Sequence, residues 1–450
     1  MAQGNGLTRG DRNRNRKLLV LREAVPRDRA VLAIDLGEDK QVAVVMDLEC
    51  RVLARKVVRA KAYELGGLLS WAGERAAKGG FAGLTVACEP TGHRWKALMG
   101  LADEAGQGFV CVQSMAVHRA RETDDYTLGK TDHRDAYLIG KLVTRLECYL
   151  PERADEAWAR LRHLGARRTG LVTDLTAVRQ QAADLLGCAW PAALGAAAHP
   201  LESVTWMAAM AVVTARCAGR PERLRKTGYA RFLAAVRREL PRWGGKRIRH
   251  SVVRGLWDAL AGTGGVTAQR PGAVERLELL MEDLHDLRRK LGATESRMLA
   301  VLDELGLAEL ACSIDGVSAL SAAAILAETG DPRRFATGRA LVKHAGLNPS
   351  EHTSATLNGQ TRISRRGRPA LRCAAWRAAW AALRSNAVLQ AKYAHLTGRE
   401  GSRLAGGQAR IACAAALLRW LHAVITAGRA WDPRIAAGET SARTVTAAAA

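Results

Sequence analysis

The sequence is organised around the stretch Lys130-Thr131-Asp132-His133-Arg134-Asp135-Ala136, which follows a loop at residues 121–129 and opens an apolar segment at residues 136–143 that predicts a helix. Residues three positions apart share a helix face, so Asp132 and Asp135 can point at one spot. Two converging carboxylates, joined by others, would form the oxygen ligand set that Mg²⁺ prefers. The alternative is a solvated helix N-terminus, where the helix dipole favours acids.

Residues 29–150 alternate between strand and helix patterns. Residues 30–37 predict a strand that carries Asp35 near its end, and residues 41–47 and 51–58 are two further β-branched runs. A helical stretch covers residues 62–77, a buried strand at residues 84–88 ends at Glu89, a helix follows, and residues 109–112 predict a fifth strand. Three strands, a helix, a strand, a helix, a strand and a final helix is the order of ribonuclease H-like folds. The predicted fold class is therefore α/β here and all-α in the rest of the chain.

Four acids occupy matching places in this order. Asp35 lies on the first strand, Glu89 ends the fourth, and Asp132 and Asp135 open the last helix. Together with the sequence motif Lys-Thr-Asp-x-x-Asp-Ala, this D-E-D-D set makes the region resemble the RuvC-like N-terminal domain of the insertion-sequence 110 family of transposases. The resemblance implies a catalytic domain at residues 29–150 whose four acids bind Mg²⁺, with Lys130 contacting nucleic acid. Acids at strand ends are also common as surface turn residues, which is the alternative for any one of them.

The charge of the chain restricts its partners. Sixty-eight lysines and arginines against 44 acids give a formal net charge of +24, which favours a nucleic acid over a membrane surface. The apolar run at residues 204–215 is too short to cross a bilayer, and the basic residues 1–28 predict a disordered tail without a signal-peptide core. The nine cysteines contain no Cys-x-x-Cys pair, which argues against a zinc ribbon or a disulfide framework. A cytoplasmic protein is expected.

The middle region, residues 151–305, is predicted to be helical with two heptad series. The first runs through Leu164, Leu171, Val178 and Leu185, and the second through Leu277, Leu284, Leu291, Met298 and Leu305. These coiled-coil helices could pair within one chain or between subunits. The basic insert at residues 188–269 contains no recognisable motif. Its basic runs at residues 220–226 and 237–249 could contact nucleic acid or form a solvated surface.

A second block of motifs covers residues 306–432, and residues 433–450 are predicted to be a tail. Residues 312–322 resemble a helix-hairpin-helix, although Ser318 replaces the second hairpin glycine. With residues 328–335, 345–349 and 363–372, they look like the transposase domain of the same family. Trp376 and Trp380 have the i, i+4 spacing of core residues and are left out of the predicted site. The mainly helical C-terminal domain is expected to grip the phosphate backbone with Arg362, Arg365, Arg366, Arg368 and Arg372.

The resemblance also implies a reactive serine, which counting from Gly346 places at Ser354. A serine hydroxyl needs assistance to act as a nucleophile, and the helpers would be the metal site and His352. The family usually has glycine after this serine, whereas this chain has Ala355. A Ser/Thr-rich loop is otherwise a solvated connection. The fallback nucleophiles are Thr353, Ser350 and Thr356, while Ser364 is assigned to the basic motif.

The predicted function is a DNA transposase or site-specific recombinase that cuts and rejoins donor and target DNA through a phosphoserine intermediate. The resemblance implies guidance by a non-coding bridge RNA. Dimers that pair as a tetramer, assembled through the heptad helices, would let different subunits supply the metal site and the serine. One alternative is a metal-dependent junction nuclease without a covalent intermediate. Another is a nucleic-acid-binding remnant without catalysis.

Overall fold

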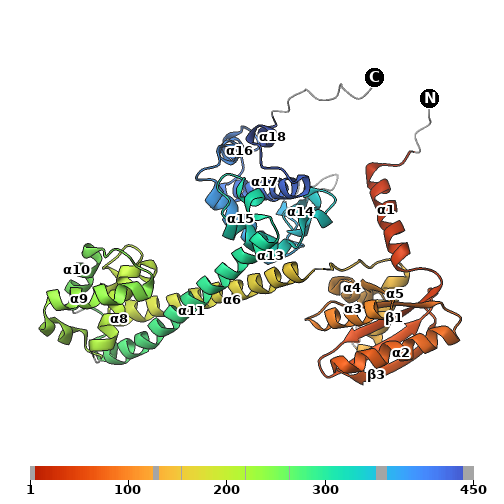
Figure 1. The fold of residues 1–450 in the computed structure, drawn as a ribbon, viewed down its shortest axis with the longest axis horizontal. Helices are drawn as coiled ribbons and strands as arrows, with labels where there is room; N and C mark the ends of the chain where they lie inside the picture. The colour runs from red at the N-terminus through yellow and green to blue at the C-terminus, as the bar shows by residue number, and fades with distance from the viewer. Residues whose placement is uncertain are drawn as a thin grey trace. The chain divides into compact units, whose positions relative to one another are not determined.

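The computed structural model describes residues 6–124, 131–153, 155–217, 219–262, 264–350 and 362–438. The chain forms two compact units, residues 1–153 and residues 154–450. The first contains a mixed sheet with helices, and the second is mainly helical (Figure 1). The predicted combination of an α/β region with a largely helical remainder is confirmed.

The five-stranded sheet of the first unit has the order β3-β2-β1-β4-β5. Strands β1, β2 and β3 form an antiparallel meander, whereas β4 and β5 continue from β1 in parallel. The predicted sequence of strands is confirmed to within a residue or two at each end. The bounds are β1 (Arg29–Leu36), β2 (Lys40–Met46), β3 (Val52–Arg59), β4 (Gly83–Cys88) and β5 (Gly108–Cys111).

Helices cover both faces of this sheet. Along β1, Leu32 and Ile34 pack in the core with α2 and α3, while Val31 and Ala33 pack on the opposite face with α1, α4 and α5. This alternation follows from the two-residue period of a strand. It also puts Asp35, which has the parity of Val31 and Ala33, on the face that α5 covers. The helices are α1 (Arg9–Ala24), α2 (Ala62–Lys78), α3 (Arg94–Glu104), α4 (Ser114–Asp124) and α5 (Asp132–Thr144).

Two segments of this unit differ from the sequence prediction. Residues 9–24, predicted to be part of a disordered tail, form α1 because Thr8 and Asp11 make a capping box and Leu21 and Val25 are buried against the sheet. Residues 121–124, predicted to lie in a loop, are the last turn of α4. The composition of both segments is polar, so neither has a strong periodic signal of its own.

Two long helices, α6 (Glu156–Ala189) and α11 (Arg270–Glu304), run antiparallel and pack along each other within the second unit. Ion pairs join Arg160 to Glu304 at 2.8 Å and Arg168 to Glu295 at 2.9 Å. The heptad residues lie mainly on the packed faces. The two helical series therefore pair within one chain, which is one of the two alternatives that the sequence leaves open, and their apolar side chains cover each other there. The expectation that these helices assemble subunits stays a prediction.

The basic insert between these helices is a small helical bundle. Its core is formed by large apolar side chains, among them Trp206 and Phe232, packed against the ends of α6 and α11. The bundle contains α7 (Pro191–Leu194), α8 (Val204–Cys217), α9 (Tyr229–Glu239) and α10 (His250–Ala259).

The opposite ends of α6 and α11 enter the core of the C-terminal helices, where Trp158 and Met298 pack with residues of α13, α15 and α17. Helix α17 is, among the described residues, the one helix long and apolar enough to cross a membrane, but 61% of its apolar window is buried in this core. The predicted tail begins with a short helix, α18. The elements are α12 (Ala308–Cys312), α13 (Ala319–Thr329), α14 (Gly338–His344), β6 (Pro349–Ser350), β7 (Arg362–Ile363), α15 (Pro369–Ala382), α16 (Ala387–Gly398), α17 (Gly406–Ala427) and α18 (Pro433–Ala437).

Candidate active site

The parallel pairing of β1 and β4 brings two of the predicted acids to one edge of the sheet. Ile34 is the register partner of Cys88, so Asp35, which is still on β1, and Glu89, which directly follows β4, come next at this edge of the sheet. Both are half-buried. Asp35 has the parity of Ala33, whose side chain packs on the α5 face, so strand alternation directs the Asp35 carboxylate toward that helix.

Asp132 approaches the same edge from α5. Thr131 caps the helix by accepting a hydrogen bond from the backbone N–H of Arg134, which fixes Asp132 in the first turn. The Oδ2 atom of Asp132 lies 2.9 Å from Nζ of Lys40, the first residue of β2. Because a short turn joins Asp35 to Lys40, this contact places Asp132 near the end of β1. The pair is partly exposed, so it contributes little to stability.

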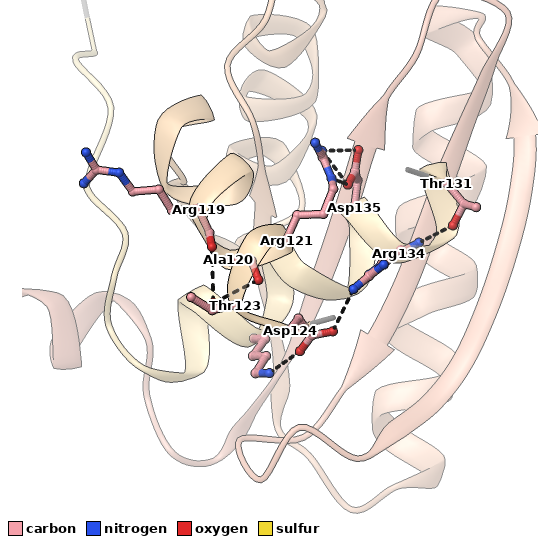
Figure 2. A network of polar contacts seen from close by, with 9 residues as sticks. Arg119, Ala120, Arg121, Thr123, Asp124, Thr131, Arg134 and Asp135 are labelled. Atoms are coloured by element: carbon pink, nitrogen blue, oxygen red, sulfur yellow. Dashed lines mark hydrogen bonds and ion pairs between the residues drawn. The ribbon is translucent and has the colours of Figure 1, made fainter. Parts of the chain in front are cut away.

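Asp135, one turn further along α5, has a different partner (Figure 2). Its side chain is 8% exposed and accepts three hydrogen bonds from Arg121 of α4, two from Nη2 at 2.7 and 2.8 Å and one from Nε at 2.9 Å. This is the bidentate geometry that makes an Arg–carboxylate pair strong. The two acids of the heptapeptide thus contact different cations.

A second set of contacts ties α4 to α5 (Figure 2). Asp124, the last residue of α4, accepts a hydrogen bond from Lys141 at 2.5 Å and lies 3.8 Å from the guanidinium group of Arg134. These contacts and the Arg121–Asp135 pair fix the end of α4 against the first half of α5. Sequence reasoning missed them, because it assigned Arg121 to a loop and nothing in the local pattern links it to Asp135.

The donor atoms of these acids suit a divalent cation, since carboxylate oxygens are the ligands that Mg²⁺ prefers. Asp35, Glu89 and Asp132 come from three elements that meet at one edge of the sheet. Within the ranges that the structure describes, no three His, Cys, Asp or Glu side chains are close enough to form a ligand set. An ion at this edge would therefore have to compete with Lys40 for Asp132 and, to engage Asp135, with Arg121.

In the second unit, β6 and β7 form a short antiparallel hairpin, and the predicted nucleophile lies between the two strands in the sequence. Ser350 is the register partner of Arg362. Ser354, Thr353, Thr356, His352 and Lys130 lie outside the described residues. The base of the hairpin is held by Ser364, which donates a hydrogen bond from Oγ to Oδ1 of Asn348 at 2.7 Å and another from its backbone N–H to the carbonyl oxygen of Asn348.

Two glycines explain why the motifs at residues 345–349 and 363–372 occur together. Gly346 has φ of +68°, and a Cβ at this position would lie 3.0 Å from the backbone carbon of Arg365. A Cβ on Gly367 would lie 2.4 Å from the carbonyl oxygen of His344. The two backbones therefore approach each other more closely than side chains permit. This contact positions the hairpin against the N-terminus of α15.

The five predicted arginines divide into two groups. Arg368 pairs with the buried Glu328 at 3.0 Å and Arg372 donates to the carbonyl oxygen of Ala345, so both stabilise the fold. Arg362, Arg365 and Arg366 are exposed. A groove of about 830 Å³ lies beside the hairpin, lined by Lys343, Asn348, Ser350, Arg362, Ser364 and Arg366 together with Ile363. Sequence reasoning did not include Lys343.

His344 lies beneath this basic surface. Its burial, followed by the nearby guanidinium groups of Arg334, Arg368 and Arg162, lowers its pKa from 6.5 to about 4. Its ring contacts Nη2 of Arg334 at 3.4 Å, and its carbonyl oxygen accepts a hydrogen bond from the backbone N–H of Arg368. A neutral imidazole at this point avoids adding one more positive charge to the cluster.

Comparison with known families identifies both parts of the chain. A profile described as "Transposase", of the DEDD type of IS110 elements, matches residues 32–191, and a profile described as "Transposase IS116/IS110/IS902 family" matches residues 308–394. Two separate regions of the chain are therefore similar to transposases of IS110-type elements. The first match contains the four acids, and the second contains the β6–β7 hairpin and the arginine cluster.

Two relatives are similar to this chain over part of its length. The insertion element IS900 uncharacterized 42 kDa protein of Mycobacterium paratuberculosis is 28% identical over 281 residues, which cover 60% of this chain and 65% of that protein. A probable family 20 transposase of Pseudomonas aeruginosa is 30% identical over 98 residues, covering 22% of this chain and 29% of that protein. The matches thus span less than two thirds of either relative.

Proposed function

We propose that this chain is the DNA transposase of an insertion sequence, which cuts and rejoins DNA strands. The observation that carries the proposal is that both family domains occur in one chain, and that the register of β1 and β4 places Asp35 beside Glu89 while α5 supplies Asp132 at the same edge. The name of the Pseudomonas aeruginosa relative, a probable transposase, supports the same function.

In this proposal, the ribonuclease H-like domain holds Mg²⁺ with Asp35, Glu89, Asp132 and Asp135. When bound, the ion supplies charge stabilisation for the phosphate that is transferred and relieves repulsion among the carboxylates. Lys40 and Arg121 neutralise Asp132 and Asp135 in the arrangement described above, so they keep like charges at this edge from destabilising the fold. Asp135 also anchors α4, which makes its role partly structural.

The cutting step uses the hydroxyl of Ser354, which lies between β6 and β7 in the sequence. A bond forms between Oγ and phosphorus while the bond from phosphorus to one sugar oxygen breaks, and the serine proton is transferred so that the leaving sugar oxygen becomes a hydroxyl. Attack of another strand's sugar hydroxyl on the phosphoserine reverses these changes and restores the serine. No net hydrolysis occurs, and the phosphodiester count is conserved.

The partners follow from the charge of the chain and from the family. Arg362, Arg365 and Arg366, with Lys343, form an exposed basic surface beside the hairpin that suits a phosphate backbone. Donor and target DNA would bind at this surface, and a non-coding bridge RNA would guide them there. The protein would act in the cytoplasm. A dimer or tetramer in which subunits share the metal site and the serine would have to assemble through surfaces other than the packed faces of α6 and α11.

The test is to trap the covalent intermediate with a purified chain, its insertion-sequence ends and the RNA encoded beside it. Ser354→Ala should bind nucleic acid normally yet form no protein–DNA adduct, whereas Ser350→Ala, at the base of the same loop, should retain the adduct. An adduct that persists in Ser354→Ala and maps to another hydroxyl would move the role to that residue. Cleavage by the unaltered chain without any adduct would favour the junction nuclease instead, and absence of cleavage with Mg²⁺ present would favour a binding remnant.

A further inference from the structure

Helix α15 carries two tryptophans on the surface of the C-terminal core. Trp376 and Trp380 are stacked, with ring centroids 5.6 Å apart and an interplanar angle of 24°, and they are 38% and 40% exposed. Their i, i+4 spacing predicted core residues, and this expectation is wrong, because α15 buries Ala375, Ala378 and Ala379 instead. Exposing this much aromatic surface costs free energy unless something covers it.

A cation and a hollow lie beside these rings. The guanidinium carbon of Arg410, on α17, is 3.7 Å from the ring centroid of Trp380 and 5.8 Å from that of Tyr393. The hollow measures about 370 Å³ and is lined by Trp380, Leu383, Arg384, Gln390, Tyr393 and Arg410. Its walls are therefore aromatic and apolar, while its polar groups are two arginines and one amide.

The charges around the hollow are almost all positive. Between Arg362 and Arg419, Glu400 is the only acidic residue in the sequence. Neither Arg384 nor Arg410 has a carboxylate partner among the residues that the structure describes, whereas Arg368, at the N-terminus of α15, is paired with Glu328. Two guanidinium groups without a carboxylate, beside exposed rings, are complementary to a partner that offers both a flat ring and an anion.

We propose that this hollow binds an unpaired base of a single-stranded nucleic acid. The Arg410 guanidinium group lies over the Trp380 ring, so the base takes its place on that face of the ring, and Arg384 and the displaced Arg410 contact the neighbouring phosphates. Stacking on side chains requires a base whose faces are open, which single strands and loops offer and a duplex does not. The inference rests on the proposed function only in that it takes nucleic acid as the partner, and it involves neither the acids nor Ser354.

The test measures binding of labelled oligonucleotides to the full chain by fluorescence anisotropy. Single-stranded DNA, single-stranded RNA and a duplex of the same sequence are compared at fixed salt, because the phosphate contribution depends on salt. Trp380→Ala should weaken binding of the single strands roughly tenfold to a hundredfold, the effect of losing one stacked base, and leave duplex binding within twofold. The DNA and RNA arms show which single strand the hollow takes.

Three further variants control for folding and charge. Trp380→Phe keeps an aromatic ring and should recover most of the affinity, while Arg410→Ala should lower it with a smaller salt dependence. Trp71→Ala is the matched control, because Trp71 also has a cation over its ring, Lys56 at 5.4 Å, but lies in the first unit; it should bind like the unaltered chain. Circular dichroism checks that each variant is folded.

Several outcomes would overturn the inference. If Trp380→Ala lowers the affinity for duplex and for single strands equally, the hollow contributes only general positive charge and does not stack a base. If the affinity is unchanged in both Trp380→Ala and Arg410→Ala, the hollow is not a binding site. Self-association that disappears in Trp380→Ala, measured by sedimentation, would make a second copy of the chain the occupant. Asp132→Asn should bind the single strands normally. Loss of strand cleavage, which tests the proposed function, is therefore measured separately from loss of base binding, which tests this inference.

Discussion

Replacing Arg121 with methionine should destabilise the first unit, because it leaves Asp135 charged and nearly buried without its partner. The side chains of Arg121 and Asp135 are 17% and 8% exposed and share three hydrogen bonds. Removing one member of a buried ion pair costs about 3–5 kcal/mol. The partial exposure of Arg121 puts the expected loss near the lower end, about 3 kcal/mol.

At about 2–4 °C per kcal/mol for a domain of this size, that loss corresponds to a decrease of roughly 6–12 °C in the melting temperature of this unit. Chemical denaturation followed by circular dichroism measures the free energy directly. Arg119→Met is the matched control, since Arg119 is an exposed arginine on the same helix and its loss should cost less than about 0.5 kcal/mol.

A double-mutant cycle separates this pair from general effects of the substitution. Asp135→Asn combined with Arg121→Met should be less destabilised than the sum of the two single variants, because neither is then left as an uncompensated charge. If Arg121→Met unfolds at the same denaturant concentration as Arg119→Met, the pair does not stabilise the unit. The assignment of Arg121 as the structural partner of Asp135 would then be wrong.

Asp132→Asn should abolish strand exchange with little change in stability, because the contact between Asp132 and Lys40 is partly exposed and is worth about 0–1 kcal/mol. Full activity of this variant would contradict the metal site. So would full activity of the unaltered chain after chelation of divalent cations. The pKa of His344 is about 4 in the folded chain and near 6.5 when unfolded, so the unfolded state binds more protons between these values, and stability should fall as pH decreases from about 6.5 toward 4. Discounted for partial exposure, the loss is about 1–2 kcal/mol and should be absent in His344→Gln, as urea titrations at several pH values would show. Gly346→Ala should cost about 1–3 kcal/mol, because its φ of +68° and the close backbone of Arg365 both oppose a Cβ, and an unchanged unfolding midpoint would show that the motif tolerates a side chain there.

Local sequence patterns determined much of the first unit. Alternating apolar residues placed the strands, and the position of Asp35 and Glu89 at strand ends predicted that they meet, which the parallel register of β1 and β4 supports. The N-terminus of α5 was also predictable, because Thr131 is a good helix cap and acids are favoured in the first turn. Each of these signals depends on residues close together in the chain. The heptad series likewise predicted two long helices, although it left their partner open.

Tertiary structure alone decided which side chains meet across long stretches of chain. Arg121 reaches Asp135 because α4 packs against α5, and α6 pairs with α11 because the bundle between them reverses the chain direction. The exposure of Trp380 had the same origin, since spacing along a helix defines a face but not what covers it. Periodicity specifies local geometry, whereas partners are set by the packing of whole elements, and no local pattern encodes that packing.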